Sequence, residues 1–128
     1  MPNQPVRVYI VDEDASVRIA YARLVDSAMM QSFTFSSVED FLQSEFTDDK
    51  ACVVSDVPMP GISGFELPVL LNRAGRELSV ILITSCDTQE MRNVARCAGA
   101  VAYFRKPVDG QALLDAINWA TSEHGAGK

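Results

Sequence analysis

Five short apolar runs, rich in β-branched and aromatic residues, alternate along the chain with stretches that carry apolar residues at helical spacing. This alternation constrains the fold more than any other feature, because parallel strands joined by helices build one sheet with right-handed crossovers. We expect strands at about 6–11, 32–35, 51–55, 79–84 and 101–104. We expect helices at about 15–29, in a short segment capped by Ser36, and at about 64–73, 88–98 and 109–122.

The pattern predicts an α/β fold, a doubly wound five-stranded parallel sheet in the flavodoxin-like order 2-1-3-4-5 with helices on both faces. In this order the first and third strands are neighbours, and a crevice opens at their carboxyl ends. The length of 128 residues fits one domain. We expect this domain to occupy residues 1–122 and residues 123–128 to be a tail or the start of a linker.

Composition excludes several classes of protein. No apolar run approaches the roughly 20 residues that span a bilayer, and the N-terminus lacks the pattern of a signal peptide. The net charge of −6 argues against a surface that binds nucleic acid directly. Cys52, Cys86 and Cys97 form no C-x-x-C pair and indicate reduced thiols, so we expect a cytoplasmic location.

Pairs with the S-x-x-E or D-x-x-E spacing indicate three helix starts. They are Ser36/Glu39, Ser63/Glu66 and Asp87/Glu90. Pro68 falls one residue beyond the first helical turn if Ser63 is the cap. Because proline lacks the N–H that a helix interior needs, we expect the third helix to start late or to kink.

Polar side chains follow four of the five predicted strands. The set is Asp12 and Glu13, Asp56, Thr84 and Ser85, and Lys106. Carboxyl ends of parallel strands meet at one edge, so we expect these side chains to gather there. Three carboxylates so close together repel one another, and an all-oxygen set without His or Cys favours Mg²⁺. A metal, a hydroxyl and an ammonium around Asp56 suit a phosphoryl group, with Asp56 as the nucleophile.

Each of these features also has a purely structural explanation. An acidic triplet after a strand is commonly a solvated turn with a helix cap, and an Asp before a Pro-rich turn is a common loop residue. A flavin mononucleotide binder is one alternative, but it needs a Ser/Thr/Gly-rich phosphate loop where residues 12–14 are acidic. A phosphatase that uses an Asp nucleophile is another, but it needs a D-x-D pair that residues 56–58 lack.

Taken together, the motifs resemble the receiver domain of bacterial two-component response regulators, over about residues 6–122. The matching residues are Val11-Asp12-Glu13-Asp14, Asp56-x-x-Met59-Pro60-x-x-x-Gly64, Ile83-Thr84-Ser85, Gly99-Ala100 and Tyr103-x-x-Lys106-Pro107. The resemblance implies that Asp56 accepts a phosphoryl group from a sensor histidine kinase. It also implies a protein that catalyses only its own phosphorylation and dephosphorylation, and is otherwise no enzyme.

The resemblance further implies a metal site and a switch. Asp12, Glu13, Asp56 and the backbone carbonyl of Pro58 are the ligands expected for Mg²⁺ (or Mn²⁺). Thr84 and Lys106 are expected to contact the phosphoryl oxygens, and Tyr103 to turn inward when Thr84 moves. The Lys106–Pro107 bond is expected to be cis.

The expected output surface is the face formed by the fourth helix, fifth strand and fifth helix, over about residues 88–122. In the family this face forms homodimers or contacts an output domain, so we expect a role in transcription through a helix-turn-helix domain if the chain is a fragment. A stand-alone phosphorelay protein and a degenerate docking receiver are the alternatives. The chain departs from the family pattern at several positions. Glu13 stands where many receivers have Asp, and Pro58 and Cys86 suggest that a phosphorylated Asp56 would lose its phosphate slowly. Pro68 has no functional explanation.

Overall fold

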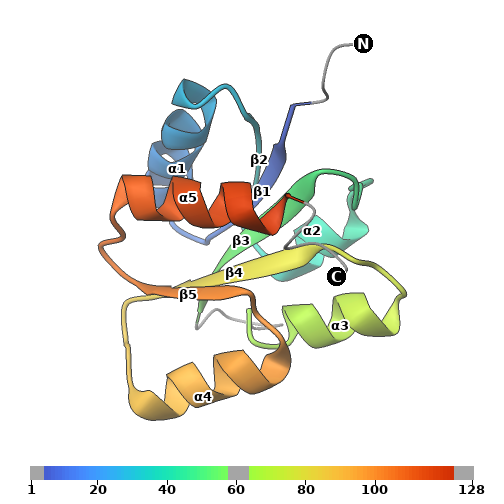
Figure 1. Ribbon diagram of the computed structural model, residues 1–128, viewed down its shortest axis with the longest axis vertical. Coiled ribbons are helices and arrows are strands. Elements are labelled where there is room, and N and C mark those ends of the chain that lie inside the picture. The colour runs from blue at the N-terminus through green and yellow to red at the C-terminus, as the bar shows by residue number, and fades with distance from the viewer. Residues whose placement is uncertain (1–4, 58–63, 123–128) are drawn as a thin grey trace.

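The computed structural model describes residues 5–57 and 64–122, whose strands form one parallel sheet in the order β2-β1-β3-β4-β5 (Figure 1). The strands are β1 (Arg7–Val11), β2 (Gln31–Phe35), β3 (Ala51–Val57), β4 (Ser79–Thr84) and β5 (Ala102–Arg105). The helices are α1 (Ala15–Ser27), α2 (Val38–Gln43), α3 (Leu67–Arg73), α4 (Gln89–Ala98) and α5 (Gly110–Ala120). The predicted fold class and strand order are confirmed.

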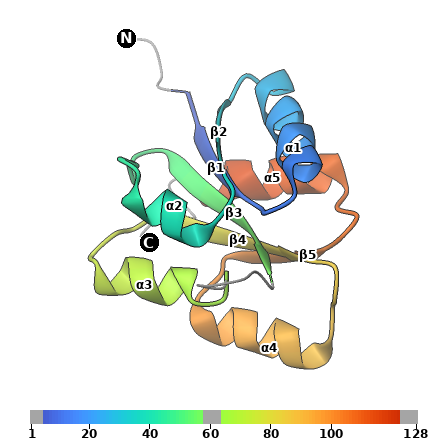
Figure 2. The same ribbon diagram turned by 180° about the vertical axis from the view of Figure 1, so that it is seen from behind.

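Helices cover both faces of the sheet, as Figures 1 and 2 show from opposite sides. Successive strand residues point to opposite faces, so β1 divides its apolar side chains between two cores. Val8 and Ile10 pack with residues of α1 and α5, whereas Tyr9 and Val11 pack with residues of α2, α3 and α4. The central strands β3 and β4 are almost entirely buried, which explains their continuous apolar sequence.

Two predicted helix caps are wrong by one residue. Ser37, not Ser36, caps α2, because its hydroxyl accepts a hydrogen bond from the Asp40 N–H at 3.0 Å. Thr88, not Asp87, caps α4, and its hydroxyl accepts from the Met91 N–H at 3.1 Å. In both cases the next hydroxyl along the chain reaches the helix N–H groups better.

Helix α3 starts late, as Pro68 predicts. The helix begins at Leu67, which places Pro68 in the first turn, where its missing N–H needs no helical partner. The predicted cap Ser63 lies outside the described residues. Glu66 occupies the cap position without a side-chain capping hydrogen bond.

Strand β3 runs two residues further than predicted, to Val57. The extension pairs Asp56 with Ile83 and Val57 with Thr84 in register. Asp56 therefore lies within the hydrogen-bonded sheet, and its backbone is fixed by the central strands.

No helix in the described ranges combines the length and the apolar character that a membrane span needs.

Candidate functional site

One ammonium joins two carboxylates at the carboxyl edge of the sheet. The Lys106 Nζ lies 3.0 Å from Asp56 Oδ1 and 3.1 Å from Asp12 Oδ2. The side chain of Asp12 is 3% exposed and that of Asp56 is 12% exposed. Three strands that are far apart in the sequence thus bring together three of the residues predicted for the site.

The backbone around Asp12 and Lys106 is held by the neighbouring strands. The Asp12 N–H donates to the Phe35 carbonyl at 3.1 Å, and its carbonyl accepts from Arg18 Nη1 at 2.6 Å. The Lys106 N–H donates to the Thr84 carbonyl at 2.7 Å. These contacts fix where both side chains leave the main chain, so the ammonium reaches the carboxylates from a defined position. The Lys106–Pro107 bond is cis, as the resemblance implies.

The charges at this edge depend on one another. Burial raises the pKa of Asp56, the hydrogen bond from Lys106 opposes that rise, and the negative charge of Asp12 adds to it. Burial opposes the charge on Lys106, but its hydrogen bonds to Asp56 and Asp12 raise the pKa of the ammonium above its ordinary value. The lysine therefore stays protonated and partly neutralises two carboxylates.

Thr84 ends β4 at the same edge and is fully buried. Its hydroxyl oxygen accepts a hydrogen bond from the Cys86 N–H at 3.0 Å. The same hydroxyl donates to the Cys86 carbonyl at 3.4 Å, so its hydrogen bonds in the described part of the chain go to the loop that leads to α4 and not to Asp56 or Lys106. Ser85 follows as an exposed residue.

The three acidic residues that follow β1 have three different environments. Asp12 contacts Lys106, whereas Asp14 caps α1 by accepting hydrogen bonds from the Ser16 and Val17 N–H groups. Glu13 is exposed, and no group of three His, Cys, Asp or Glu side chains in the described ranges is arranged to hold a metal. In the described part of the chain, Glu13 is therefore not gathered with Asp12 and Asp56. Pro58, the predicted carbonyl ligand, lies outside the described residues.

Gly64 packs directly against the end of β3. A Cβ added at Gly64 would lie 2.8 Å from the Asp56 carbonyl oxygen and 2.4 Å from a methyl group of Val57. Backbone in that position cannot accommodate a side chain. The sequence motif contains this glycine, but spacing alone did not reveal that it packs against the backbone of Asp56.

Tyr103, the predicted switch residue, lies on β5 opposite Leu82. Its ring packs against the apolar layer under α3 and α4, and its hydroxyl oxygen is buried. Burial raises the pKa of Tyr103, and the negative charge of Asp87 adds to the effect. The D-x-x-E spacing predicts that Asp87 caps α4, but its carboxylate instead forms an ion pair with Arg92 at 2.8 Å, which the spacing does not indicate.

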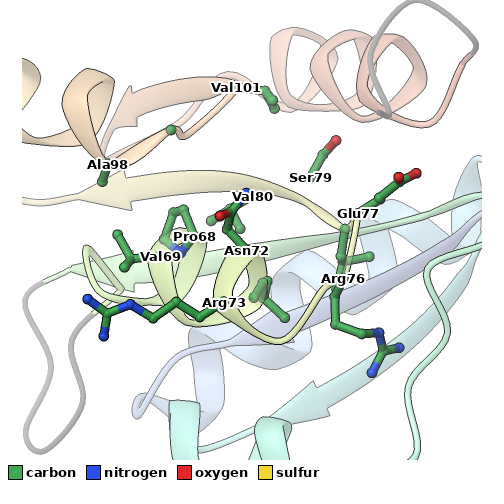
Figure 3. A pocket seen from close by; sticks show the side chains of 13 residues that line it. Pro68, Val69, Asn72, Arg73, Arg76, Glu77, Ser79, Val80, Ala98 and Val101 are labelled. Carbon is green, nitrogen blue, oxygen red and sulfur yellow. The ribbon is translucent and has the colours of Figure 1, made fainter. Parts of the chain in front are cut away.

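Of two surface cavities, one lies next to Lys106 and the other lies away from the site. A hollow of about 440 Å³ next to Lys106 is lined mainly by apolar residues of α1 and by Pro107 and Val108. A larger cavity of about 550 Å³ lies between α3 and the starts of β4 and β5, and Figure 3 shows Asn72, Arg73, Val80 and Val101 around it. None of the predicted site residues lines the larger cavity.

The fold and the edge cluster define a doubly wound domain with an acidic crevice neutralised by a lysine. Residues 8–118 match the family model described as the response regulator receiver domain. The chain belongs to this family.

Known relatives are similar over most of this chain. It is 36% identical over 113 residues to the transcriptional regulatory protein TdiR of Thauera aromatica, covering 88% of this chain and 50% of that protein. It is 34% identical over 110 residues to the transcriptional regulatory protein FixJ of Azorhizobium caulinodans, covering 86% and 52%. The chain thus spans about half the length of these curated relatives.

Solved structures show the same fold. The crystal structure of FixJ-N has a TM-score of 0.83 and 29% identity, covering 94% of this chain and 97% of that one. The BeF3-activated DrrB receiver domain has a TM-score of 0.78 and 27% identity, covering 90% and 96%.

Proposed function

We propose that this receiver domain takes a phosphoryl group from the phosphohistidine of a sensor histidine kinase onto Asp56. One observation carries the proposal: the Lys106 ammonium lies 3.0 Å from Asp56 and 3.1 Å from Asp12. A nucleophilic carboxylate next to a fixed cation is the arrangement that phosphoryl transfer requires, because the transferred group develops negative charge on its oxygens.

In the proposed reaction a carboxylate oxygen of Asp56 attacks phosphorus and the phosphorus–nitrogen bond of the donor breaks. The electron pair of that bond stays on the departing imidazole nitrogen, and the product is an acyl phosphate on Asp56. Lys106, already beside the carboxylate, neutralises a phosphoryl oxygen. The Thr84 hydroxyl, now bonded to the Cys86 N–H, turns to donate to another phosphoryl oxygen.

The donor set fits Mg²⁺ or Mn²⁺ in part. Mg²⁺ in phosphoryl-transfer sites takes one or two carboxylates and keeps several waters, and Asp12 and Asp56 supply two carboxylates at one edge. Asp12 and Asp56 would hold the ion, with Glu13 and the Pro58 carbonyl as the further ligands that the family resemblance implies. When bound, the ion supplies positive charge to the phosphoryl oxygens.

We propose a role in transcription for the protein that contains this domain. The relatives TdiR and FixJ are named transcriptional regulators, and the chain spans about half of each. An output domain that binds DNA is therefore the proposed partner, in addition to the kinase and to a second copy of the chain. The surface of α4, β5 and α5 is the proposed face for output contacts or dimerisation.

The test uses acetyl phosphate as donor, with MgCl₂, on the wild type and on Asp56→Asn. Intact-mass spectrometry should show one added phosphoryl group on the wild type and none on the variant. Asp26→Asn, which alters an exposed carboxylate of α1, is the matched control and should be phosphorylated like the wild type. A wild type that stays unmodified, or equal labelling of Asp56→Asn, would reject the proposal and favour a docking receiver.

A further inference from the structure

The edge strand β2 lies in the longest run of the sequence that carries no charged side chain. Residues 27–38 contain no Asp, Glu, Lys or Arg, although 22% of the chain is charged. Natural proteins protect exposed edge strands with charged side chains or proline, because an open edge can pair with a strand of another chain. Strand β2 has neither, whereas β5 at the opposite edge carries the exposed Arg105. The β2 edge is therefore open to a further strand.

The backbone of β2 offers hydrogen bonds on the side away from β1. In the described part of the chain β2 pairs with β1 alone. The Gln31 N–H and the Phe35 carbonyl form hydrogen bonds of 2.8 and 3.1 Å on the side of β1. Successive residues of a strand direct their backbone groups to alternate sides, so Ser32 and Thr34 each present an N–H and a carbonyl to the open edge.

Two exposed apolar side chains belong to the same uncharged run. Met29, in the turn before β2, is 87% exposed, and Phe33, in the middle of β2, is 39% exposed. The Phe33 ring packs against the Tyr9 ring, with the ring centroids 5.4 Å apart, so it is held at the edge while part of its surface stays in contact with water. Covering this apolar surface with a second apolar surface is favourable.

A second copy of the same strand fits this edge by symmetry. When two β2 strands run antiparallel around a two-fold axis at Phe33, Ser32 of one copy lies opposite Thr34 of the other. Each of the two pairs exchanges two backbone hydrogen bonds, which uses the outward groups of both residues. Phe33 then lies opposite its own copy, where the side chains of a non-hydrogen-bonded pair come close. Since each copy has a net charge of −6, an uncharged edge lets two copies meet without opposing like charges.

We propose that the β2 edge is a self-association surface, at which two copies of this chain pair their β2 strands antiparallel around Phe33 and join their sheets into one. This surface lies at the opposite end of the sheet from β5, so it is separate from the face proposed for output contacts. It uses no residue of the phosphoryl-transfer site and does not depend on the proposed function of Asp56. The contact is small, so the expected dimer is weak.

Sedimentation equilibrium of the full chain, without Mg²⁺ or a phosphoryl donor, measures the association. Phe33→Lys places two like charges across the axis, and Thr34→Pro removes an N–H that points away from β1. We expect each substitution to weaken the dimer about tenfold or more. Val69→Lys is the matched control, because Val69 lies on α3 and is 38% exposed, and it should associate like the wild type. Circular dichroism melts verify that each variant is folded.

Disulfide cross-linking tests the register. Cys86→Ser and Cys97→Ser first remove the two exposed thiols, and Cys52 stays because it is buried. In this background Phe33→Cys should form a linked dimer under mild oxidation, since the Cα atoms of a non-hydrogen-bonded antiparallel pair lie about 4.5 Å apart, within disulfide range. Gln31→Cys, exposed on the same strand, should form a linked dimer at least about tenfold more slowly, because its own copy lies four positions away along the paired strands.

Three results would overturn the inference. A wild type that stays monomeric at about 1 mM rejects self-association and leaves the edge to a strand of a different protein. Association that persists unchanged in both Phe33→Lys and Thr34→Pro places the contact elsewhere on the chain. Equal cross-linking of Phe33→Cys and Gln31→Cys rejects the symmetric pairing around Phe33. Each of these results is independent of whether Asp56 is phosphorylated.

Discussion

The Lys106 ammonium lies 3.1 Å from the Asp12 carboxylate, although the two residues are 94 positions apart in the sequence. The same ammonium lies 3.0 Å from Asp56. Asp12 is almost fully buried, and its carboxylate contacts this ammonium and accepts a hydrogen bond from the Asp14 N–H at 2.9 Å. The two carboxylates therefore share one lysine side chain as their cation at this edge of the sheet.

Replacing Lys106 by Met should destabilise the fold by about 1–3 kcal/mol, because two neighbouring carboxylates then lack their cation. Mg²⁺ should restore more of the lost free energy of unfolding in this variant than it adds to the wild type, since the ion can take over the role of the ammonium. Urea denaturation with and without MgCl₂ measures both effects. Lys106→Arg, which keeps the charge, is the control. An equal response to Mg²⁺ in all three proteins would contradict the prediction.

Asp56→Asn should stabilise the domain at pH 7 by about 1 kcal/mol. Burial raises the pKa of Asp56, so the folded state binds a proton more tightly than the unfolded state and becomes less stable as the pH rises through the range between the two values. The amide removes this penalty. The gain over the wild type should shrink as the pH falls through the raised folded-state pKa of Asp56 toward the ordinary value of 3.8, because the wild-type carboxyl takes up its proton over that range. Thermal melts from pH 4 to 7 test this, and a pH-independent gain would contradict it.

Arg76→Ala should cost about 1–2 kcal/mol of stability, more than an exposed ion pair contributes. Arg76 donates to the Asp48 carboxylate at 2.7 Å and to the Phe46 carbonyl at 2.8 Å, and its guanidinium carbon lies 4.0 Å from the centre of the Phe46 ring. The exposed Arg73, three residues earlier, is the matched control, and Arg73→Ala should change stability by less than about 0.5 kcal/mol. Equal losses in the two variants, measured by urea denaturation, would show that the contacts of Arg76 contribute little.

The contribution of the Asp48 contact should vanish in acid. Burial by itself would raise the pKa of Asp48, but hydrogen bonds from Arg76 and from the Glu77 N–H hold it below its ordinary value of 3.8. A carboxylate with a lowered pKa stabilises the fold above that ordinary value and stops doing so as the pH falls through the folded-state value. The difference in stability between the wild type and Asp48→Asn should therefore be full at pH 7 and smaller at about pH 3. A difference that stays constant would indicate that the contact is not ionic.

Gly64→Ala should destabilise the domain by about 2–3 kcal/mol and slow phosphorylation of Asp56, because the new methyl group would collide with the Asp56 carbonyl. Gly75→Ala is the comparison. It has open space around its Cβ but a φ of +74°, so it should cost about 1 kcal/mol and leave phosphorylation unchanged. Denaturation and acetyl phosphate labelling measure the two effects. Similar phosphorylation rates in both variants would contradict the role of Gly64.

The periodicity of the chain predicted the sheet order and all ten elements, because buried parallel strands and amphipathic helices leave strong local patterns. The prediction that Asp12, Asp56 and Lys106 meet at one edge, made from the ends of the strands that they follow, is confirmed. The caps of α2 and α4 were missed by one residue, since two adjacent polar residues compete for the same N–H groups and local spacing does not decide between them.

The sequence could not show which of the three acids after β1 reach the site. That choice depends on the direction in which each side chain leaves the turn, so Glu13 faces solvent and Asp14 caps α1. The pairing of Asp87 with Arg92 was likewise hidden, because a residue at the start of a helix can either cap it or contact a side chain five positions on.

The parallel pairing of β1 with β3 joins two strands that are not consecutive in the chain, and the order of synthesis has a consequence for the nascent polypeptide. A chain still emerging from the ribosome, with β5 not yet made, carries both aspartates but not Lys106. Such an intermediate lacks the ammonium that lies beside both carboxylates in the complete domain, so this edge of the sheet gains its cation only when the residue after β5 has been added.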